Sequence, residues 1–413
     1  MAKRIAAILF IFVCTWFAWA ALGATIFART YSADATLKGQ VESVWGAPHQ
    51  QLPPTASYQW IEKKKEESIR DGKANVSITE VTHTEPLLLE ASAVQAALNL
   101  EHRQKGLLWY STYRVVFGGE YSFRNTSRQP QTVSFDLTFP ANLAVYDHLT
   151  LTLDGAPAPY TTFSTGVQVR ALVAGGATAR FRVGYASQGL DRWSYKFGPN
   201  EVNTARNFDL RMTTSFPEID FPDGSLSATE KRATGGGWEL HWAYQNLVSG
   251  AQIIMPMPEK LQPGPLAGQI SLFAPVSLFF FFFLMFIITT LREINLHPMH
   301  YFFLACAFFA FHLLLAYLVD HISIHSAFLV CSAVSIFLVV SYLRTVIGPR
   351  FAFVEAGLAQ FIYLVLFSYA FFFKGFTGLA ITIGAIVTLF VVMQMTARVQ
   401  WDAVFAKAAT AAR

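Results

Sequence analysis

The chain has 413 residues, of which 53% are hydrophobic and 14% are charged, and its net charge is +4. Soluble domains carry about 25% charged residues, so this composition favours a membrane protein. The modest and dispersed positive charge does not indicate binding to nucleic acid. All three cysteines (Cys14, Cys306 and Cys331) lie in apolar runs, so no disulfide framework is predicted for the polar part of the chain.

The first segment, residues 1–29, begins with Lys3 and Arg4 and is apolar over residues 5–27. Two interpretations are open. The apolar run is long enough to span a membrane at about 1.5 Å per residue. Alternatively, Ala18-Trp19-Ala20 offers the small-x-small site of a cleaved signal peptide. Because the apolar run continues beyond that site, we predict an N-terminal transmembrane anchor, and either interpretation sends the following residues across the membrane.

Residues 30–265 are polar enough for a domain outside the membrane, and over residues 106–244 apolar and polar side chains alternate repeatedly. Strands that bury one face and expose the other have this period of two, so an all-β periplasmic domain resembling a β-sandwich is predicted. The alternation is clearest at residues 133–139, 149–153, 179–185 and 238–244.

Shorter features of this domain carry their own predictions. Residues 76–81 alternate as a further strand, and the mixed-charge run of residues 62–73 predicts a solvated loop or helix face. Residues 125–131 predict a hairpin connection, residues 235–237 (three glycines) a turn, and residues 256–265 a linker back to the membrane.

The C-terminal part, residues 266–398, is predicted to be a five-helix transmembrane domain, followed by a cytoplasmic tail at residues 399–413. Its apolar runs cover residues 268–290, 301–319, 326–346, 351–373 and 376–396. Each run is long enough to cross a bilayer. With the N-terminal anchor, the chain has six predicted transmembrane helices, and the fold class is a membrane α-helical bundle with an all-β periplasmic domain.

The basic residues between the spans predict the orientation. With the N-terminus in the cytoplasm, the short outside loops carry only Lys374. The inside segments then carry Lys3, Arg4, Arg292, Arg344, Arg350, Arg398, Lys407 and Arg413. The positive-inside rule therefore predicts that both termini are cytoplasmic.

Five polar positions in the membrane part are candidates for function. His297 and His300 flank Pro298 and could suggest a metal or proton site, but two histidines do not complete a metal shell, and Pro298 indicates a helix start. Asp320 and His321 could form a pH-sensitive pair, or could cap helix ends in headgroup water. In both cases we favour the structural interpretation and predict no bound metal.

The fifth candidate, His312, lies near the middle of a span. Ionisable groups there are costly, and they are functional candidates by default. A proton or ion relay is one interpretation. We favour a neutral histidine that bonds a neighbouring helix through Ser332, Ser335 or Gln360, because no acidic residue lies at the same depth.

The sequence contains no motif that predicts catalysis. No serine, histidine and acid fall into a nucleophile-elbow context, and no glycine-rich loop joins a strand to a helix. In the polar domain, His241 lies on the polar face of a strand, and His102 and His148 are isolated. We therefore predict no enzymatic activity, no catalytic residues and no cofactor.

The sequence Leu296-His-Pro-Met-His-Tyr301, followed by Phe311, Leu314, Leu315 and Asp320-His321, resembles the CreD family of inner-membrane proteins. The layout is similar too, with one N-terminal span, a large periplasmic domain and several C-terminal spans. Weaker matches are residues 103–106 with Tyr113 and Gly119, residues 213–216, and residues 398–401. The chain departs from the family pattern at Asp320, where glutamate is expected.

The resemblance implies a multi-pass protein of the bacterial inner membrane, with a role in cell-envelope integrity and colicin tolerance under two-component control. The family has no agreed catalytic residues, so none is assigned here. We predict a non-enzymatic binding or scaffolding role through the periplasmic domain, with membrane lipid and envelope proteins as partners. The linker at residues 256–265 and the strand around Trp238 are candidate contact surfaces. The alternative is a transporter or channel that uses the C-terminal helices, and an envelope hydrolase ranks third.

Overall fold

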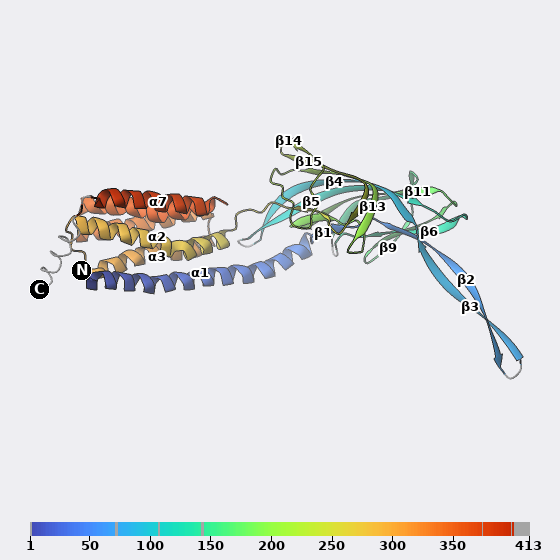
Figure 1. Ribbon diagram of the computed structural model, residues 1–413, viewed down its shortest axis with the longest axis horizontal. Helices are drawn as coiled ribbons and strands as arrows, with labels where there is room; N and C mark the ends of the chain where they lie inside the picture. Colours follow the sequence, from blue (N-terminus) through green and yellow to red (C-terminus); the bar gives the residue numbers. More distant parts are fainter. Residues whose placement is uncertain are drawn as a thin grey trace. The chain divides into compact units, whose positions relative to one another are not determined.

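The computed structural model describes residues 2–70, 73–105, 108–141, 144–373, 375–397 and 399. The chain divides into a helical unit, Met1–Thr36 with Leu261–Arg413, and a β unit, Leu37–Lys260. Among the described residues, six helices are long and apolar enough to cross a membrane, and the strands form three sheets. Figure 1 shows the helices and the strands in separate parts of the molecule. The predicted fold class, a membrane helical bundle plus a β domain, is confirmed.

The spans follow the predicted apolar runs. They are α1 (Ala2–Val44), α2 (Pro263–Leu291), α3 (Pro298–Leu318), α4 (Ile324–Val346), a fifth span (Phe351–Phe372) and α7 (Thr377–Thr396). Pro263 and Pro298 each stand at the start of a helix, where the missing amide proton costs no hydrogen bond. Helix α1 continues well beyond residue 29, because the residues that follow include good helix formers and no proline.

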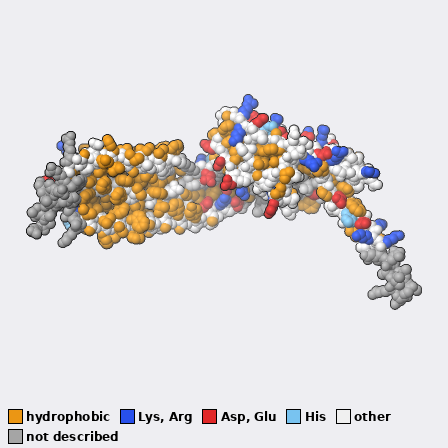
Figure 2. All heavy atoms as spheres, viewed as in Figure 1, with side chains coloured by type: hydrophobic (Ala, Val, Ile, Leu, Met, Phe, Trp, Pro, Cys, Tyr) orange, Lys and Arg blue, Asp and Glu red, His pale blue; other side chains and the backbone are white. Residues whose placement is uncertain are grey.

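Large apolar side chains fill the interior of the helical unit, and others cover its outer surface (Figure 2). The outward-facing apolar side chains suit a hydrocarbon solvent. Small residues bring α1 and α2 together. A Cβ atom placed on Gly268 would lie 3.1 Å from the ring of Phe27, so the glycine permits a close helix approach.

The fifth span is the irregular one. It consists of the π-helical segment η1 (Phe351–Ala356), α5 (Gly357–Gln360), a second π-helical segment η2 (Phe361–Leu366), α6 (Phe367–Tyr369) and a final 3₁₀ turn, η3 (Ala370–Phe372). Such π-helical insertions in α-helices occur frequently at functional sites.

The β unit contains three sheets. In order across each sheet, the largest has β14 (Glu230–Thr234), β15 (Gly237–Ser249), β13 (Asn203–Thr214), β4 (Leu88–Lys105), β5 (Leu108–Arg124), β11 (Thr178–Leu190), β7 (Tyr146–Leu153) and β8 (Ala156–Pro157). The second has β3 (Lys73–Pro86), β2 (Thr55–Arg70), β6 (Gln131–Thr138), β10 (Gly166–Val173) and β9 (Tyr160–Phe163). The third has β1 (His49–Gln51), β12 (Arg192–Tyr195) and β16 (Ile253–Pro256).

The apolar residues of the alternating strands meet in one core. The ring of Phe135 on β6 stacks 5.5 Å from the ring of Phe181 on β11 and packs edge-on, at 5.7 Å, against Phe123 on β5. Side chains of the five-stranded and eight-stranded sheets therefore pack face to face, which is the reason for the period of two in the sequence.

Two short predictions for the β unit are wrong. The mixed-charge run is part of strand β2 and not a loop or helix face, because it pairs with β3 residue by residue and places Lys63 3.4 Å from Glu80; residues 71–72 of that run lie outside the described residues. Residues 125–131 do not close a hairpin, since they connect strands in different sheets. The buried Asn125 amide fixes that crossing by donating to the carbonyl oxygen of Val173 (3.0 Å). The turn at residues 235–237 is confirmed, because Thr234 pairs with Gly237.

Strands β2 and β3 extend far beyond the other strands of their sheet. β2 pairs with β6 only from Thr55 to Tyr58, and within the described residues its remainder pairs with β3 alone. We call residues 59–70 and 73–84 the arm. Figure 1 shows it as a two-stranded ribbon that projects from the sheets.

Candidate functional site

The polar positions at the start of α3 serve the helix entry. The Nδ1 atom of His297 accepts a hydrogen bond from the backbone amide of Met299 (3.2 Å), which caps the helix. The Nδ1 atom of His300 lies 2.6 Å from the hydroxyl of Tyr342 on α4. Both contacts satisfy polar groups at a helix end.

Asp320 and His321 lie beyond the other end of α3. The carboxylate of Asp320 forms an ion pair with Arg29 of α1 (3.1 Å), and Arg29 also donates to the carbonyl oxygen of Ala316 (2.7 Å). His321 is exposed in the following turn. The 21 residues of α3 separate this end from His297 and His300 by about 30 Å. The structure therefore does not bring the four residues into one site, and no metal-binding group occurs among the described residues.

His312 is fully buried in the helical unit, as predicted for a mid-span residue. Its Nδ1 atom lies 2.9 Å from the carbonyl oxygen of Phe308 one turn earlier, and its ring meets Trp19 edge-on at 5.7 Å. The partners predicted for it bond elsewhere. Ser335 donates to the carbonyl oxygen of Ala307 (2.7 Å) and accepts from the amide of Gln360 (2.9 Å).

A second buried histidine, which the sequence did not single out, lies inside the β unit. The Nε2 atom of His49 on β1 lies 3.4 Å from the hydroxyl of Ser187, and its ring meets Tyr113 edge-on at 5.7 Å. Burial lowers the pKa of His49 to about 4, and a backbone hydrogen bond at Gln188 offsets part of this shift. Burial also raises the pKa of Tyr146, which stacks beside it, to about 12. His49 is closed off from solvent and Tyr146 is half-buried, so this cluster packs within the β unit and is no open site.

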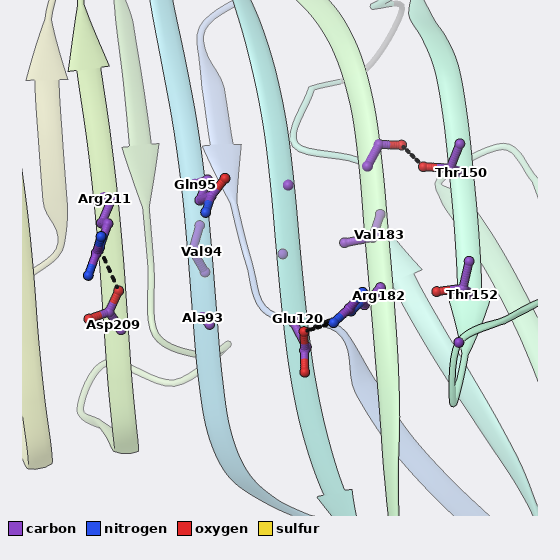
Figure 3. Close-up of a pocket in the computed structure, with 14 residues that line it drawn as sticks. Ala93, Val94, Gln95, Glu120, Thr150, Thr152, Arg182, Val183, Asp209 and Arg211 are labelled. Atoms are coloured by element: carbon purple, nitrogen blue, oxygen red, sulfur yellow. Dashed lines mark hydrogen bonds and ion pairs between the residues drawn. The ribbon is translucent and has the colours of Figure 1, made fainter.

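The outer face of the eight-stranded sheet carries an open hollow of about 680 Å³, which we call the trough. Its lining comes from β13, β4, β5, β11 and β7 and from the turn after β7 (Figure 3). The lining residues are Ala93, Val94, Gln95, Gly118, Gly119, Glu120, Thr150, Thr152, Gly155, Arg182, Val183, Gly184, Asp209 and Arg211.

The strand register arranges the outward-facing residues of the trough in two neighbouring rows. One row reads Asp209, Ala93, Glu120, Arg182, Thr152 across the five strands. The next row reads Arg211, Gln95, Gly118, Gly184, Thr150. In the second row, polar side chains stand at both ends and two glycines lie between them, whereas the charged pair Glu120 and Arg182 occupies the middle of the first row.

The floor of the trough is formed by two glycines that face each other on β5 and β11. A Cβ atom added at Gly118 would have no heavy atom within 4 Å, so the space above this residue is open. A Cβ atom added at Gly184 would come within 2.8 Å of the hydroxyl of Thr150. Glycine in the interior of a strand often marks a site where a ligand or another backbone approaches closely.

Charges of both signs border the floor and are already paired. Glu120 and Arg182 form an ion pair at 2.7 Å, and Asp209 lies 3.6 Å from Arg211 (Figure 3). Asp209 also lies 2.6 Å from the Nε2 atom of His241 on β15. The trough therefore presents a balanced set of hydrogen-bond donors and acceptors and no excess charge.

No pattern in the sequence predicts the trough, and the alternation of residues 238–244 places His241 only on the polar face of a strand. The residues that line the trough come from positions 93 to 211, and they are neighbours only because β13 pairs in parallel with β4. The local signal was limited to the consecutive glycines Gly118-Gly119 inside a run of strand-forming residues.

The comparison with protein families finds a match for the membrane part of the chain. The family model of the inner membrane protein CreD matches residues 271–402. No curated protein matches the sequence with significance.

The comparisons with solved structures carry no inference. A protein described as nutrient binding from Legionella pneumophila is 8% identical, covers 47% of this chain and 72% of its own, and has a TM-score of 0.32. An M1 zinc metallopeptidase from Deinococcus radiodurans is 13% identical, with 41% and 42% covered and a TM-score of 0.27. Both TM-scores are too low to carry an argument about fold or function.

The family match covers four of the five C-terminal spans completely and the larger part of α2. It includes the sequence around Pro298 on which the resemblance was based. Over these residues the chain resembles the CreD family of inner membrane proteins, and its six apolar helices and sheet-rich unit agree with that resemblance.

Proposed function

We propose that this inner membrane protein is a non-enzymatic binding module of the cell envelope. The β unit acts as the binding part, and the helical unit holds it at the membrane. The observation that carries the proposal is the trough, which combines a floor of glycine backbone with polar margins on one continuous sheet face.

The lining favours a ligand that is polar and without strong net charge. Arg182 and Arg211 already face Glu120 and Asp209, so an anion would have to compete with these carboxylates. Gln95, Thr150 and Thr152 supply neutral donors and acceptors. We propose a polar segment of an envelope protein as the ligand, laid across the two rows above Gly118 and Gly184.

The proposed orientation places the β unit in the periplasm and both termini in the cytoplasm. It is supported by the distribution of basic residues. Arg292, Arg344 and Arg350 lie in the segments on one side of the spans, whereas the short loops on the other side carry only Lys374.

A substitution in the floor of the trough tests the proposal. Gly118→Leu places a branched side chain over the floor of the trough and meets no neighbouring atom within 4 Å at its Cβ position, so the β unit is expected to fold normally. The matched control, Ala97→Leu, adds a similar side chain at a half-buried position of β4 outside the lining. In intact cells, crosslinking of the full chain to an envelope protein should fall with Gly118→Leu and persist with Ala97→Leu. Equal crosslinking by both variants would count against the trough as the binding site.

Transport through the C-terminal helices is the second candidate, and the irregular fifth span supports it. The π-helical segments η1 and η2 flank Gln360, which is fully buried and bonds Ser335 on α4. Transporters commonly use interrupted helices that carry polar groups at mid-membrane.

His312→Leu separates the two candidates, because it replaces the buried imidazole with an apolar side chain that suits a membrane span. Under the binding proposal, cells that carry this variant should keep normal envelope integrity, measured as resistance to detergent. If the variant inserts at the normal level and the cells yet lose that resistance, this result favours transport.

A further inference from the structure

An apolar groove runs along the surface of the helical unit between α1 and α2. Two hollows make it up, of about 380 and 310 Å³, and both are lined by Phe12 and Phe279, whose rings meet edge-on at 6.1 Å. Every side chain in the two linings is apolar or aromatic. On helices that span a membrane, such a groove is open to acyl chains and closed to water.

A positively charged side chain, Arg4, lies at one end of this groove. The guanidinium of Arg4 lies 5.7 Å from the ring centroid of Phe286, which itself lines the groove. Its Nη2 atom donates to the hydroxyl of Thr289 at 3.2 Å. The apolar groove therefore ends at a positive charge.

The guanidinium of Arg4 is not saturated by the described residues. Its Nε atom is buried and has no hydrogen-bond partner, and no carboxylate pairs with it in the part of the chain that the structure describes. Arg29, on the same helix, is different, because it pairs with Asp320 and bonds the carbonyl oxygen of Ala316. A buried donor without an acceptor is costly, and an arginine fork matches a phosphate group.

We propose that the α1–α2 groove with Arg4 is a binding site for an anionic phospholipid. The acyl chain lies against Leu9, Phe12, Phe279 and Phe283, and the phosphate accepts hydrogen bonds from the free donors of Arg4. The site is separate from the trough and does not depend on the proposed function of the β unit.

The test uses the full-length protein in mild detergent and native mass spectrometry with two lipids that have identical acyl chains. Wild type should retain phosphatidylglycerol in preference to phosphatidylcholine. Arg4→Gln should weaken retention of phosphatidylglycerol by roughly tenfold, the effect of losing a charge-assisted hydrogen bond. Arg344→Gln removes one positive charge from an exposed position outside the groove, and should change nothing.

A second variant tests the groove without changing the charge. Leu9 is 59% exposed, so Leu9→Trp should fill the groove without disturbing the packed interior. Both lipids should then be lost together. Equal losses with Arg4→Gln and Arg344→Gln would show a general charge effect and overturn the proposal. Retention unchanged by Leu9→Trp, or equal retention of the two lipids by wild type, would overturn it as well.

Discussion

His49 shows how a single buried side chain couples the β unit to pH. Its imidazole is 1% exposed and lies among Ser187, Tyr113 and Tyr146. The charged form would lose its hydration there, and this desolvation lowers the pKa of His49 from 6.5 to about 4. Inside the β unit the ring therefore stays neutral under conditions that would protonate it in an unfolded chain.

The sign of the resulting pH effect follows from proton linkage. Between pH 6.5 and about 4, the unfolded chain binds a proton at His49 and the folded chain does not. The free energy of unfolding is therefore unaffected by His49 above pH 6.5 and decreases as the pH falls from 6.5 to about 4. The loss should reach about 3 kcal/mol. We expect the melting temperature of the β unit, measured on the full chain in detergent, to fall over this range.

Two variants control the pH experiment. His49→Gln should lower stability at neutral pH and flatten its dependence on acid, since the titrating group is gone. His148→Gln changes a side chain that is 83% exposed and should keep the wild-type dependence. The prediction is wrong if all three proteins lose the same stability between neutral pH and pH 4.

At the scale of elements, the arm is the unusual feature. Isolated two-stranded ribbons are marginally stable in water, and the arm runs far beyond the sheet that anchors it. Local pairs support it. The ring of Trp60 stacks on His83 at 4.5 Å, and His83 lies 2.9 Å from Glu62. None of these contacts reaches the core of the β unit, so the arm adds little to its stability.

Shortening the arm should therefore leave the β unit folded. Replacing residues 62–81 by an Asn-Gly turn joins Ile61 to Thr82, which already face each other. The melting temperature of the β unit should change by less than the ~2–4 °C that corresponds to 1 kcal/mol in a unit of this size. In contrast, Ala56→Asp introduces a charge at a buried position of β2 and should lower it strongly. A large drop on shortening would show that the arm supports the core.

For the whole molecule, orientation in the membrane is the main open prediction, and cysteine labelling tests it. In a chain whose Cys14, Cys306 and Cys331 are replaced by alanine, Ser127→Cys places a thiol on the β unit and Glu293→Cys places one between α2 and α3. A membrane-impermeant thiol reagent should label Ser127→Cys in spheroplasts, and label Glu293→Cys only after permeabilisation. The reverse result would invert the proposed topology.

The sequence alone determined the spans, the alternation of the strands and the class of the fold. These features are local, because about 20 consecutive apolar residues cross a bilayer by length alone and a period of two defines a one-sided strand whatever its partner. The runs at residues 133–139 and 179–185 could therefore be assigned as strands without knowing that Phe135 and Phe181 stack on each other.

Only the tertiary structure decided which strands pair and what their outer faces present. Gly118 and Gly184 form the floor of the trough because β5 and β11 are neighbours, and Arg211 borders it because β13 pairs in parallel with β4. Likewise, Arg4 lies beside Phe286 only because α1 packs on α2. Pairing depends on packing summed over the whole unit, so residues far apart in the chain carry no local sign of their contact.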